Sequence, residues 1–168
     1  MTTSMGLWLR RLTSPRRPQA PERGARRAAA LLLRLTCVGL LAWIGAVHLH
    51  LWLEGYRQIP TDGPLFLIDA ATGFALAAVL LVWAAPLTGL VAAGYTASTL
   101  GALLISLSVG LFGFRESISA SFVTLSLAIE TITVLTLLGW TALAAAASRR
   151  GRPPVRHRSP APQMSRGR

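Results

Sequence analysis

The sequence predicts an all-α fold, a four-helix transmembrane bundle flanked by disordered basic N- and C-terminal tails. Of the 168 residues, 52% are hydrophobic and 14% are charged, whereas a soluble domain of this size carries roughly 25% charged residues. The 17 basic residues are all arginine, with seven in residues 1–27 and seven in residues 148–168. Residues 70–114 carry no charge at all. An apolar middle with basic ends excludes a soluble nucleic-acid-binding domain, a secreted disulfide scaffold and a disordered chain.

The uncharged segment 70–114 is too long for one membrane crossing. A single helix over it would be about 67 Å long at 1.5 Å per residue, against a hydrocarbon core of about 30 Å. Pro86 is the natural break, because proline disrupts a helix interior but is tolerated in the first turn of a helix. Backbone groups in lipid must be satisfied internally, so each crossing is a helix. We therefore expect a membrane domain at 28–147 with spans at approximately 30–53, 64–84, 87–112 and 118–147.

The arginine distribution predicts the orientation. Both tails are rich in arginine, whereas the two loops on the other side carry only Arg57 and Arg115. Cytoplasmic flanks carry the excess of basic residues, so we expect a multi-pass plasma-membrane protein with both termini in the cytoplasm. Residues 1–27 and 148–168 are also rich in proline, and we expect disordered tails that attract anionic lipids. They lack the series of stacking aromatics used in single-strand binding, so we expect no nucleic-acid partner.

One helical face of the third span is formed by small residues. They recur at steps of four: Gly89, Ala93, Ala97 and Gly101. Small residues let two helix backbones approach closely in a membrane. We expect this face to pack against another helix of the bundle, with a dimer face as the alternative.

Three ionisable residues fall at membrane depth, where a charge costs at least ~2.5 kcal/mol, so each is a functional hypothesis. Glu130 is expected about 16 Å into its span, near the midplane. It is either a proton- or cation-coupling carboxylate or a hydrogen-bonded clip between helices. His48 and Asp69 are expected at similar depths on neighbouring spans, where a His–Asp hydrogen bond would satisfy both. A proton relay, a metal ligand or a haem ligand is the functional alternative.

The outer rim carries a candidate polar cluster, although a solvated rim is favoured over a site because exposed ion pairs are worth little. Its members are His50, Glu54, Arg57, Arg115 and Glu116. His50 and Glu54 are i,i+4 neighbours and can pair. His48 and His50 lie about 200° apart around a helix, whereas helical metal pairs use i,i+3 or i,i+4 spacing. We therefore expect no metal site and no cofactor.

Two segments resemble a known group of proteins. HLHLWLEGYRQIPTDGPLFLIDAATGFALA at 48–77 and GLFGFRE at 110–116 resemble uncharacterised small four-span integral membrane proteins of high-GC actinobacteria. The resemblance implies a four-span membrane protein and supplies no catalytic residues. It also implies an aliphatic residue at position 62 and Asn at position 69, so Asp62 and Asp69 depart from its pattern. That departure weakens the case for a special role of the Asp69 carboxylate.

Enzymatic motifs are missing from the sequence. It contains no phosphate loop, Ser-His-Asp spacing, CxxC or HExxH. We therefore expect a non-enzymatic membrane protein, a structural, accessory or interaction subunit within a larger membrane complex or homo-oligomer. The alternative is a small proton-coupled transporter that uses Glu130. A third hypothesis is a haem- or quinone-associated redox subunit that uses His48 or His50.

Overall fold

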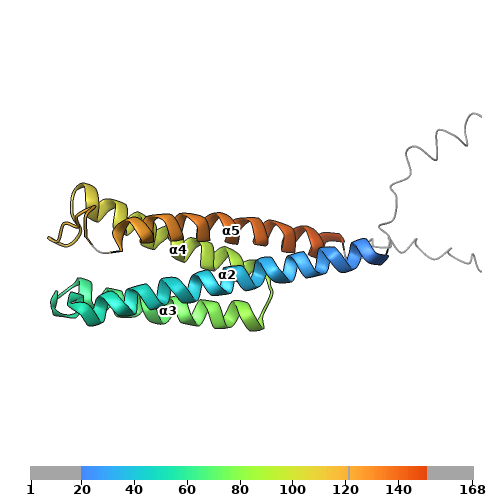
Figure 1. Ribbon diagram of the computed structural model, residues 1–168, viewed down its shortest axis with the longest axis horizontal. Helices are drawn as coiled ribbons and strands as arrows, with labels where there is room; N and C mark the ends of the chain where they lie inside the picture. The colour runs from blue at the N-terminus through green and yellow to red at the C-terminus, as the bar shows by residue number, and fades with distance from the viewer. Residues whose placement is uncertain (1–19, 121, 151–168) are drawn as a thin grey trace, which may run out of the picture.

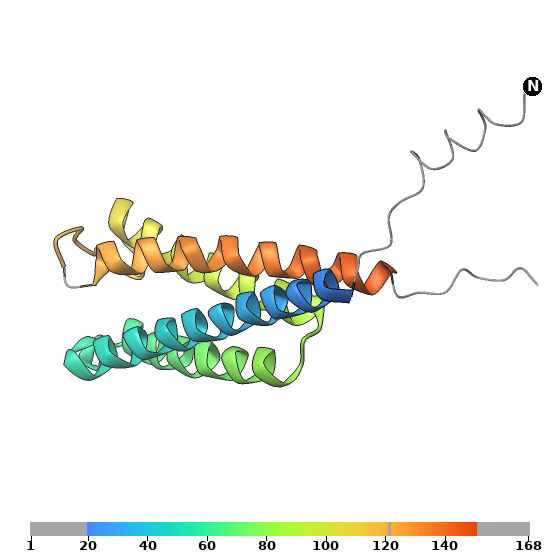
Figure 2. The same ribbon diagram turned by 45° about the vertical axis from the view of Figure 1, so that its right-hand side comes forward.

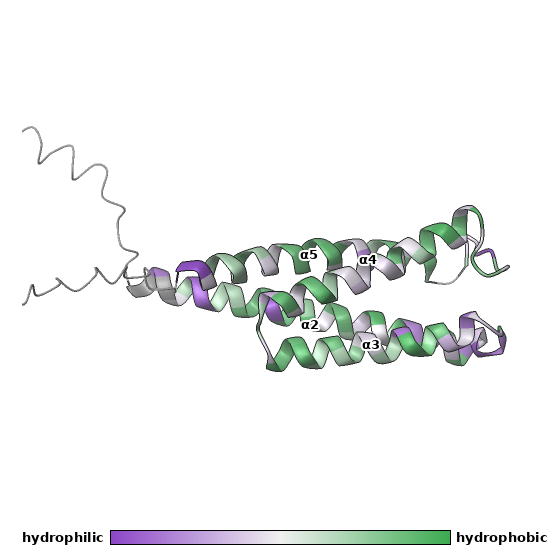
Figure 3. Cartoon of the chain, turned by 180° about the vertical axis from the view of Figure 1, so that it is seen from behind, coloured by the Kyte–Doolittle hydropathy of each residue, from purple (hydrophilic) through white to green (hydrophobic). Residues whose placement is uncertain are grey.

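The computed structural model describes residues 20–120 and 122–150, and this part of the chain is helical throughout its length apart from the connections. Four helices are long and apolar enough to cross a membrane, so the chain is a multi-pass membrane protein, as predicted. Their apolar surface runs along most of each helix (Figure 3). The elements are α2 (Ala20–Glu54), the 3-10 turn η1 (Tyr56–Gln58), α3 (Asp62–Val82), α4 (Pro86–Ser108) and α5 (Val123–Arg150).

The four helices form two antiparallel hairpins that pack side by side. α2 packs mainly on α3, α4 packs mainly on α5, and contacts between α2 and α5 join the two hairpins (Figures 1 and 2). The start of α2, the end of α5 and the α3–α4 turn lie at one end of the bundle, which we call the terminal end. The connections at residues 55–61 and 109–122 lie at the other, the loop end.

Two helix boundaries differ from the predicted spans at the loop end. α4 stops at Ser108 and α5 starts at Val123, so the connection between them is longer than expected. Gly110 follows the last turn of α4 with a φ of 88°. A left-handed glycine just after the last turn is a common way for a helix to end.

The predicted tails also differ in part from the structure. α2 begins at Ala20 and α5 continues to Arg150, so 20–27 and 148–150 are helical, not disordered as expected. Pro21 in the first turn and the alanines that follow it are compatible with a helix start. The rest of both predicted tails, 1–19 and 151–168, lies outside the described residues.

The α2–α3 pair approaches closely at small residues. A Cβ built on Gly73 would lie 3.1 Å from Gly45 Cα, and one on Gly45 would lie 3.0 Å from the Ala70 carbonyl oxygen. Close backbone approach is what holds helices together in lipid, where apolar side chains gain little by leaving the bilayer. This contact fixes the position of α3, which carries Asp62 and Asp69.

An apolar cluster fills the interior toward the terminal end, and we call it the terminal-half core. Its members are Cys37, Leu41, Ala77, Leu80, Ala92, Ala93, Leu137 and Trp140. Leu41, Leu80 and Leu137 are fully buried. The single cysteine is a buried part of this packing and is not bonded to another sulfur.

The predicted small-residue face of α4 packs over only part of its length. A Cβ on Gly89 would lie 2.6 Å from the Trp140 ring of α5, and Ala93 is buried beside it. Ala97 is exposed, and nothing lies within 4 Å of a Cβ on Gly101. Steps of four residues drift by about 40° each around a helix, which carries the later positions off the buried face.

Arg34 ties α2 to the end of α3. Its Nε donates to the Leu80 carbonyl at 2.8 Å and its Nη2 donates to the Leu81 carbonyl at 2.5 Å. The last carbonyls of a helix have no partner within the helix, and a cation there also interacts favourably with the helix dipole. Arg34 therefore fixes the α3–α4 turn against α2.

Candidate functional site

A cavity of about 120 Å³ occupies the loop half of the bundle, and we call it the polar cavity. Helices α2, α3, α4 and α5 and both loop-end connections contribute to its wall. Its ionisable lining residues are His48, Tyr56, Asp62, Asp69, Glu116 and Glu130. The structure thus brings together the three predicted intramembrane residues and adds three residues from the loop end.

Glu130 is the ionisable residue that α5 contributes to the cavity wall. It is 2% exposed, and the Thr99 hydroxyl of α4 donates to its Oε2 at 3.2 Å. Since α5 starts at Val123, Glu130 lies about 10 Å from the helix start, closer to the loop end than the predicted midplane position. The same Thr99 hydroxyl also donates to the Thr96 carbonyl at 2.9 Å. Thr99 has a single hydroxyl proton for these two acceptors. A protonated Glu130 can therefore donate its own proton to the Thr99 oxygen instead.

His48 and Asp69 face the same cavity but do not form the predicted hydrogen bond within the described structure. The Nδ1–H of His48 donates to the Ile44 carbonyl of its own helix at 2.9 Å. In that tautomer, Nε2 of a neutral imidazole is left as an acceptor. The Tyr95 hydroxyl donates to the backbone carbonyl of Asp69 at 2.7 Å, which ties α3 to α4 and leaves the Asp69 carboxyl out of that bond.

Asp62 carries a buried carboxyl oxygen without a hydrogen-bond partner in the described part of the chain. It is 7% exposed, and its Oδ2 has no hydrogen-bond partner among the described residues. It lies in the first turn of α3, where the helix dipole favours a carboxylate. Neighbouring Gly63 lets η1 lie against this turn, because a Cβ there would be 2.8 Å from the Tyr56 carbonyl oxygen. The glycine therefore brings Tyr56 and Asp62 to the same wall of the cavity.

Tyr56 and Glu116 connect the two loop-end connections. The Tyr56 hydroxyl donates to Glu116 Oε2 at 2.5 Å, and the Ser117 backbone N–H donates to Glu116 Oε1 at 3.0 Å. Burial, and then the hydrogen bond and the negative charge of Glu116, raise the pKa of Tyr56 well above its ordinary value. Both carboxyl oxygens of Glu116 are satisfied, so this residue holds the 109–122 connection in place over the cavity.

A tight turn shapes the 109–122 connection. Leu111 and Phe114 exchange two backbone hydrogen bonds of 2.7 and 2.8 Å. The two residues between them have positive φ, 48° at Phe112 and 85° at Gly113, the pattern of a type I′ turn. Phe122, which lies just before α5, also has a positive φ of 67°. For a bulky residue this backbone is costly and persists only where the surroundings enforce it.

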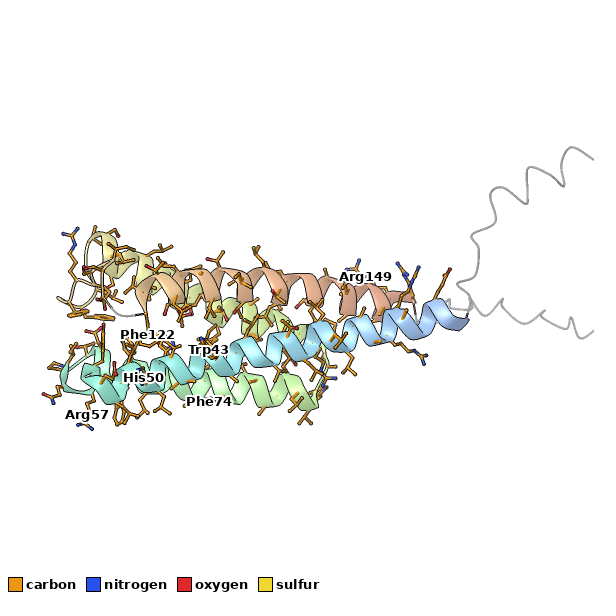
Figure 4. The ribbon with its side chains drawn as sticks, in the orientation of Figure 1. Trp43, His50, Arg57, Phe74, Phe122 and Arg149 are labelled. Atoms are coloured by element: carbon orange, nitrogen blue, oxygen red, sulfur yellow. The ribbon has the colours of Figure 1, made fainter. Side chains whose placement is uncertain are left out.

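Aromatic rings line the cavity between its carboxyl groups. The Phe66 ring centroid lies 4.5 Å from that of Tyr56 and 5.4 Å from that of His48. Phe114 stands edge-on to Tyr56 at 6.0 Å. Phe122 meets His50 edge-on at 5.2 Å, and Figure 4 shows these two side chains facing each other. The cavity wall therefore combines carboxyl residues with aromatic rings.

The candidate outer-rim cluster of five residues is assembled only in part among the described residues. His50 Nε2 and Glu54 Oε1 are 3.2 Å apart, the i,i+4 pair that the spacing predicted. Arg57 and Arg115 are exposed and join no ion pair in the part of the chain described here, and Arg57 points away from the bundle in Figure 4. Glu116 turns inward to Tyr56 instead. Exposed ion pairs gain little over solvated charges, so nothing draws the arginines together.

A second cavity lies at the terminal end. It measures about 360 Å³ and is lined by residues of α2 and α5 and of the α3–α4 turn, among them Arg34, Ala84 and Trp140. Trp140 also belongs to the terminal-half core. Along α2, α3 and α5, the residues of the terminal-half core lie between those that line the two cavities.

Sequence reasoning missed several residues of the site. Tyr56, Asp62 and Thr99 are not among the predicted site residues. The turn chemistry around Pro60, Gly63 and Pro64 was the available signal, because it places the start of α3 beside η1. Within the described residues, no group of three or more His, Cys, Asp or Glu is arranged to hold a metal ion.

Comparisons with known proteins give no relative for this chain. No family model, no curated protein and no solved structure matches it.

Proposed function

We propose that this chain is a non-enzymatic accessory or sensor-like subunit of a plasma-membrane assembly, in which the polar cavity recognises a small solute. The observation that carries the proposal is the convergence of His48, Asp69 and Glu130 from three helices on one cavity. Ionisable residues at membrane depth are costly and generally serve a site. The terminal-half core closes the interior behind that cavity, which favours binding from the loop end over passage through the bundle.

The proposed orientation has both termini in the cytoplasm and the polar cavity toward the outside. It is supported by the arginine-rich tails and by the even number of helices. Single cysteines at Gln58 and at Ser148, in a Cys37→Ala background, test it with a membrane-impermeant maleimide on intact cells. We expect labelling at position 58 and protection at position 148 until the cells are lysed. The reverse pattern would overturn the orientation.

Affinity purification of the full chain in mild detergent, followed by mass spectrometry, tests the accessory role. We expect a larger membrane protein to be recovered in constant proportion, with the arginine-rich tails and anionic lipids contributing to the association. An absorption spectrum of the same preparation tests the haem form of the redox hypothesis for His48 or His50, which requires a visible chromophore. A chain recovered alone, or with a visible chromophore, contradicts the accessory proposal.

A proton-coupled transporter is the second candidate. Two cavities separated by the terminal-half core favour it, because alternating access needs a site reachable in turn from each end. Glu130, with its shared Thr99 proton, would be the coupling group. Proteoliposomes loaded with a pH-sensitive dye should then show solute-driven proton flux that Glu130→Gln abolishes. Thr131→Val is the matched control, because that exposed hydroxyl bonds only to its own helix.

A further inference from the structure

We infer that the polar cavity binds a small organic ammonium ion. The inference rests on the proposed recognition role and names its ligand class. Its first support is charge. Four carboxyl groups line the cavity, from Asp62, Asp69, Glu116 and Glu130, and none of the described arginines does. His48 is the one lining residue that can carry positive charge. Such a wall favours a cation over an anion or a neutral solute.

The second support is independent of the cluster and comes from Asp62. A carboxyl oxygen that is almost completely buried normally has a hydrogen-bond donor, because leaving it without one is costly. Asp62 lines the cavity, and its Oδ2 is buried and has no donor among the described residues. Glu116, by contrast, has both of its oxygens bonded within the protein. Asp62 is thus a lining carboxyl whose charge is available to a bound cation.

The third support separates an organic cation from a metal ion. Phe66 and Phe114 flank the Tyr56 ring at centroid distances of 4.5 and 6.0 Å, and all three line the cavity. Aromatic faces attract ammonium groups and quaternary ammonium ions. Metal ions instead require several converging ligands, and no described group of three or more His, Cys, Asp or Glu provides them.

The size of the cavity limits the ligand. Its 120 Å³ is somewhat smaller than a cavity of about 150 Å³ that holds benzene. The ligand therefore has about five or six non-hydrogen atoms. Tetramethylammonium, which has a positive charge spread over a nearly spherical surface, matches that size and serves as the probe.

Titration calorimetry of the purified full chain in mild detergent tests the inference. We expect saturable binding of tetramethylammonium chloride that an equal concentration of NaCl does not reproduce. Asp62→Asn keeps the shape of the side chain and removes its charge, and we expect the loss of Coulomb attraction to weaken binding about tenfold or more. Phe66→Leu removes one aromatic face and should weaken binding roughly threefold to tenfold.

Two controls keep the result specific. Glu54→Gln changes an exposed carboxyl at the same end that does not line the cavity, so binding should be unchanged. Neutral tert-butanol has the same size as the probe and should not compete with it. If Asp62→Asn fails to fold, Phe66→Leu still decides the outcome. Equal binding by Phe66→Leu and wild type, full competition by tert-butanol, or no saturable binding to wild type would overturn the inference.

The test is separable from that of the proposed function. A chain that co-purifies with a partner assembly but binds no tetramethylammonium overturns this inference alone. A chain that binds tetramethylammonium through Asp62 but is recovered without a partner overturns the accessory role and leaves the ligand class standing.

Discussion

The two halves of the bundle are built from different chemistry. In the terminal-half core, Leu41, Leu80 and Leu137 are fully buried, and none of the described members of this cluster is Asp, Glu, His, Lys or Arg. In the loop half, the same four helices surround a cavity lined by carboxyl groups, a histidine and aromatic rings. In lipid, helices gain little from burying apolar surface and are held by close packing. The terminal half therefore supplies stability, while the loop half is free to carry polar groups.

The largest expected effect is a loss of packing in the terminal half. Leu137→Ala removes a side chain with no exposed surface, and we expect the free energy of unfolding to fall by about 2–5 kcal/mol because a cavity remains. Unfolding of the detergent-solubilised chain by a denaturing detergent measures the change. Leu138→Ala, at a neighbouring position that is 46% exposed, is the matched control and should change little. Equal effects at both positions would show that the buried packing of Leu137 does not stabilise the terminal half.

Overpacking the α4–α5 contact is expected to have the next largest effect. A Cβ at Gly89 would lie 2.6 Å from the Trp140 ring, so Gly89→Ala should lower the free energy of unfolding by about 1–3 kcal/mol. Nothing lies within 4 Å of a Cβ on Gly94, which makes Gly94→Ala the control for helix propensity. The same unfolding assay applies. A neutral Gly89→Ala would show that α4 and α5 are packed less closely than described.

A substitution in the loop half should act in the opposite direction. Asp62→Leu removes a buried carboxyl whose Oδ2 has no partner, and we expect stability to rise by about 1 kcal/mol. The cost of a buried polar atom without a partner, about 1–3 kcal/mol, exceeds the roughly 0.3–1 kcal/mol that a helix dipole contributes. Thermal unfolding without ligand measures the change. A marked loss of stability would show that Asp62 serves the fold and not a ligand.

The smallest expected effect concerns the link between the two loop-end connections. Tyr56→Phe removes the hydrogen bond to Glu116 Oε2 and should cost about 0.5–1.5 kcal/mol. Because the pKa of Tyr56 is raised above its ordinary value of 10.0, the associated stability is complete below pH 10 and declines as the pH rises further.

An ultraviolet difference titration of wild type against Tyr56→Phe reports this ionisation. The phenolate of Tyr56 should appear at higher pH than that of a free tyrosine. Glu116→Gln should move it back toward the ordinary value, because it removes the negative charge that opposes ionisation. A Tyr56 that titrates like free tyrosine would contradict the buried link.

The number of membrane-spanning helices and their all-α fold were predictable, because a segment that crosses lipid must be long, apolar and helical. The uncharged length of 70–114 and Pro86 were sufficient to divide α3 from α4. The end of α4 was not predicted, because Leu111 and Phe112 are apolar and hydropathy alone does not separate a membrane helix from an aromatic turn. Gly110 and Gly113, with their positive φ values, decide that boundary.

The candidate site was predictable only in its deeper part. Glu130, His48 and Asp69 stand out because charge at membrane depth is rare. Which of these residues bond to each other depends on how each helix is rotated about its own axis. That rotation is set by packing between helices and not by the local sequence. His48 bonds to its own helix, so the expected His–Asp bond is absent from the described structure. Asp62 was missed because its burial comes from η1 folding back onto α3, a contact made possible by Gly63.

The unequal lengths of the helices make bilayer thickness a variable to which the molecule responds. The 35 residues of α2 span about 52 Å, whereas the 21 residues of α3 span about 32 Å, close to the hydrocarbon thickness. In a thicker membrane, α3 has no further apolar residues to place in the lipid. The longer α2 does, up to Arg26 and Arg27, which would then lie at the headgroups. Because Arg34 couples α2 to the end of α3, the two helices respond together: a thicker bilayer thins locally around the short α3, whereas a thinner one is accommodated by tilting the whole hairpin.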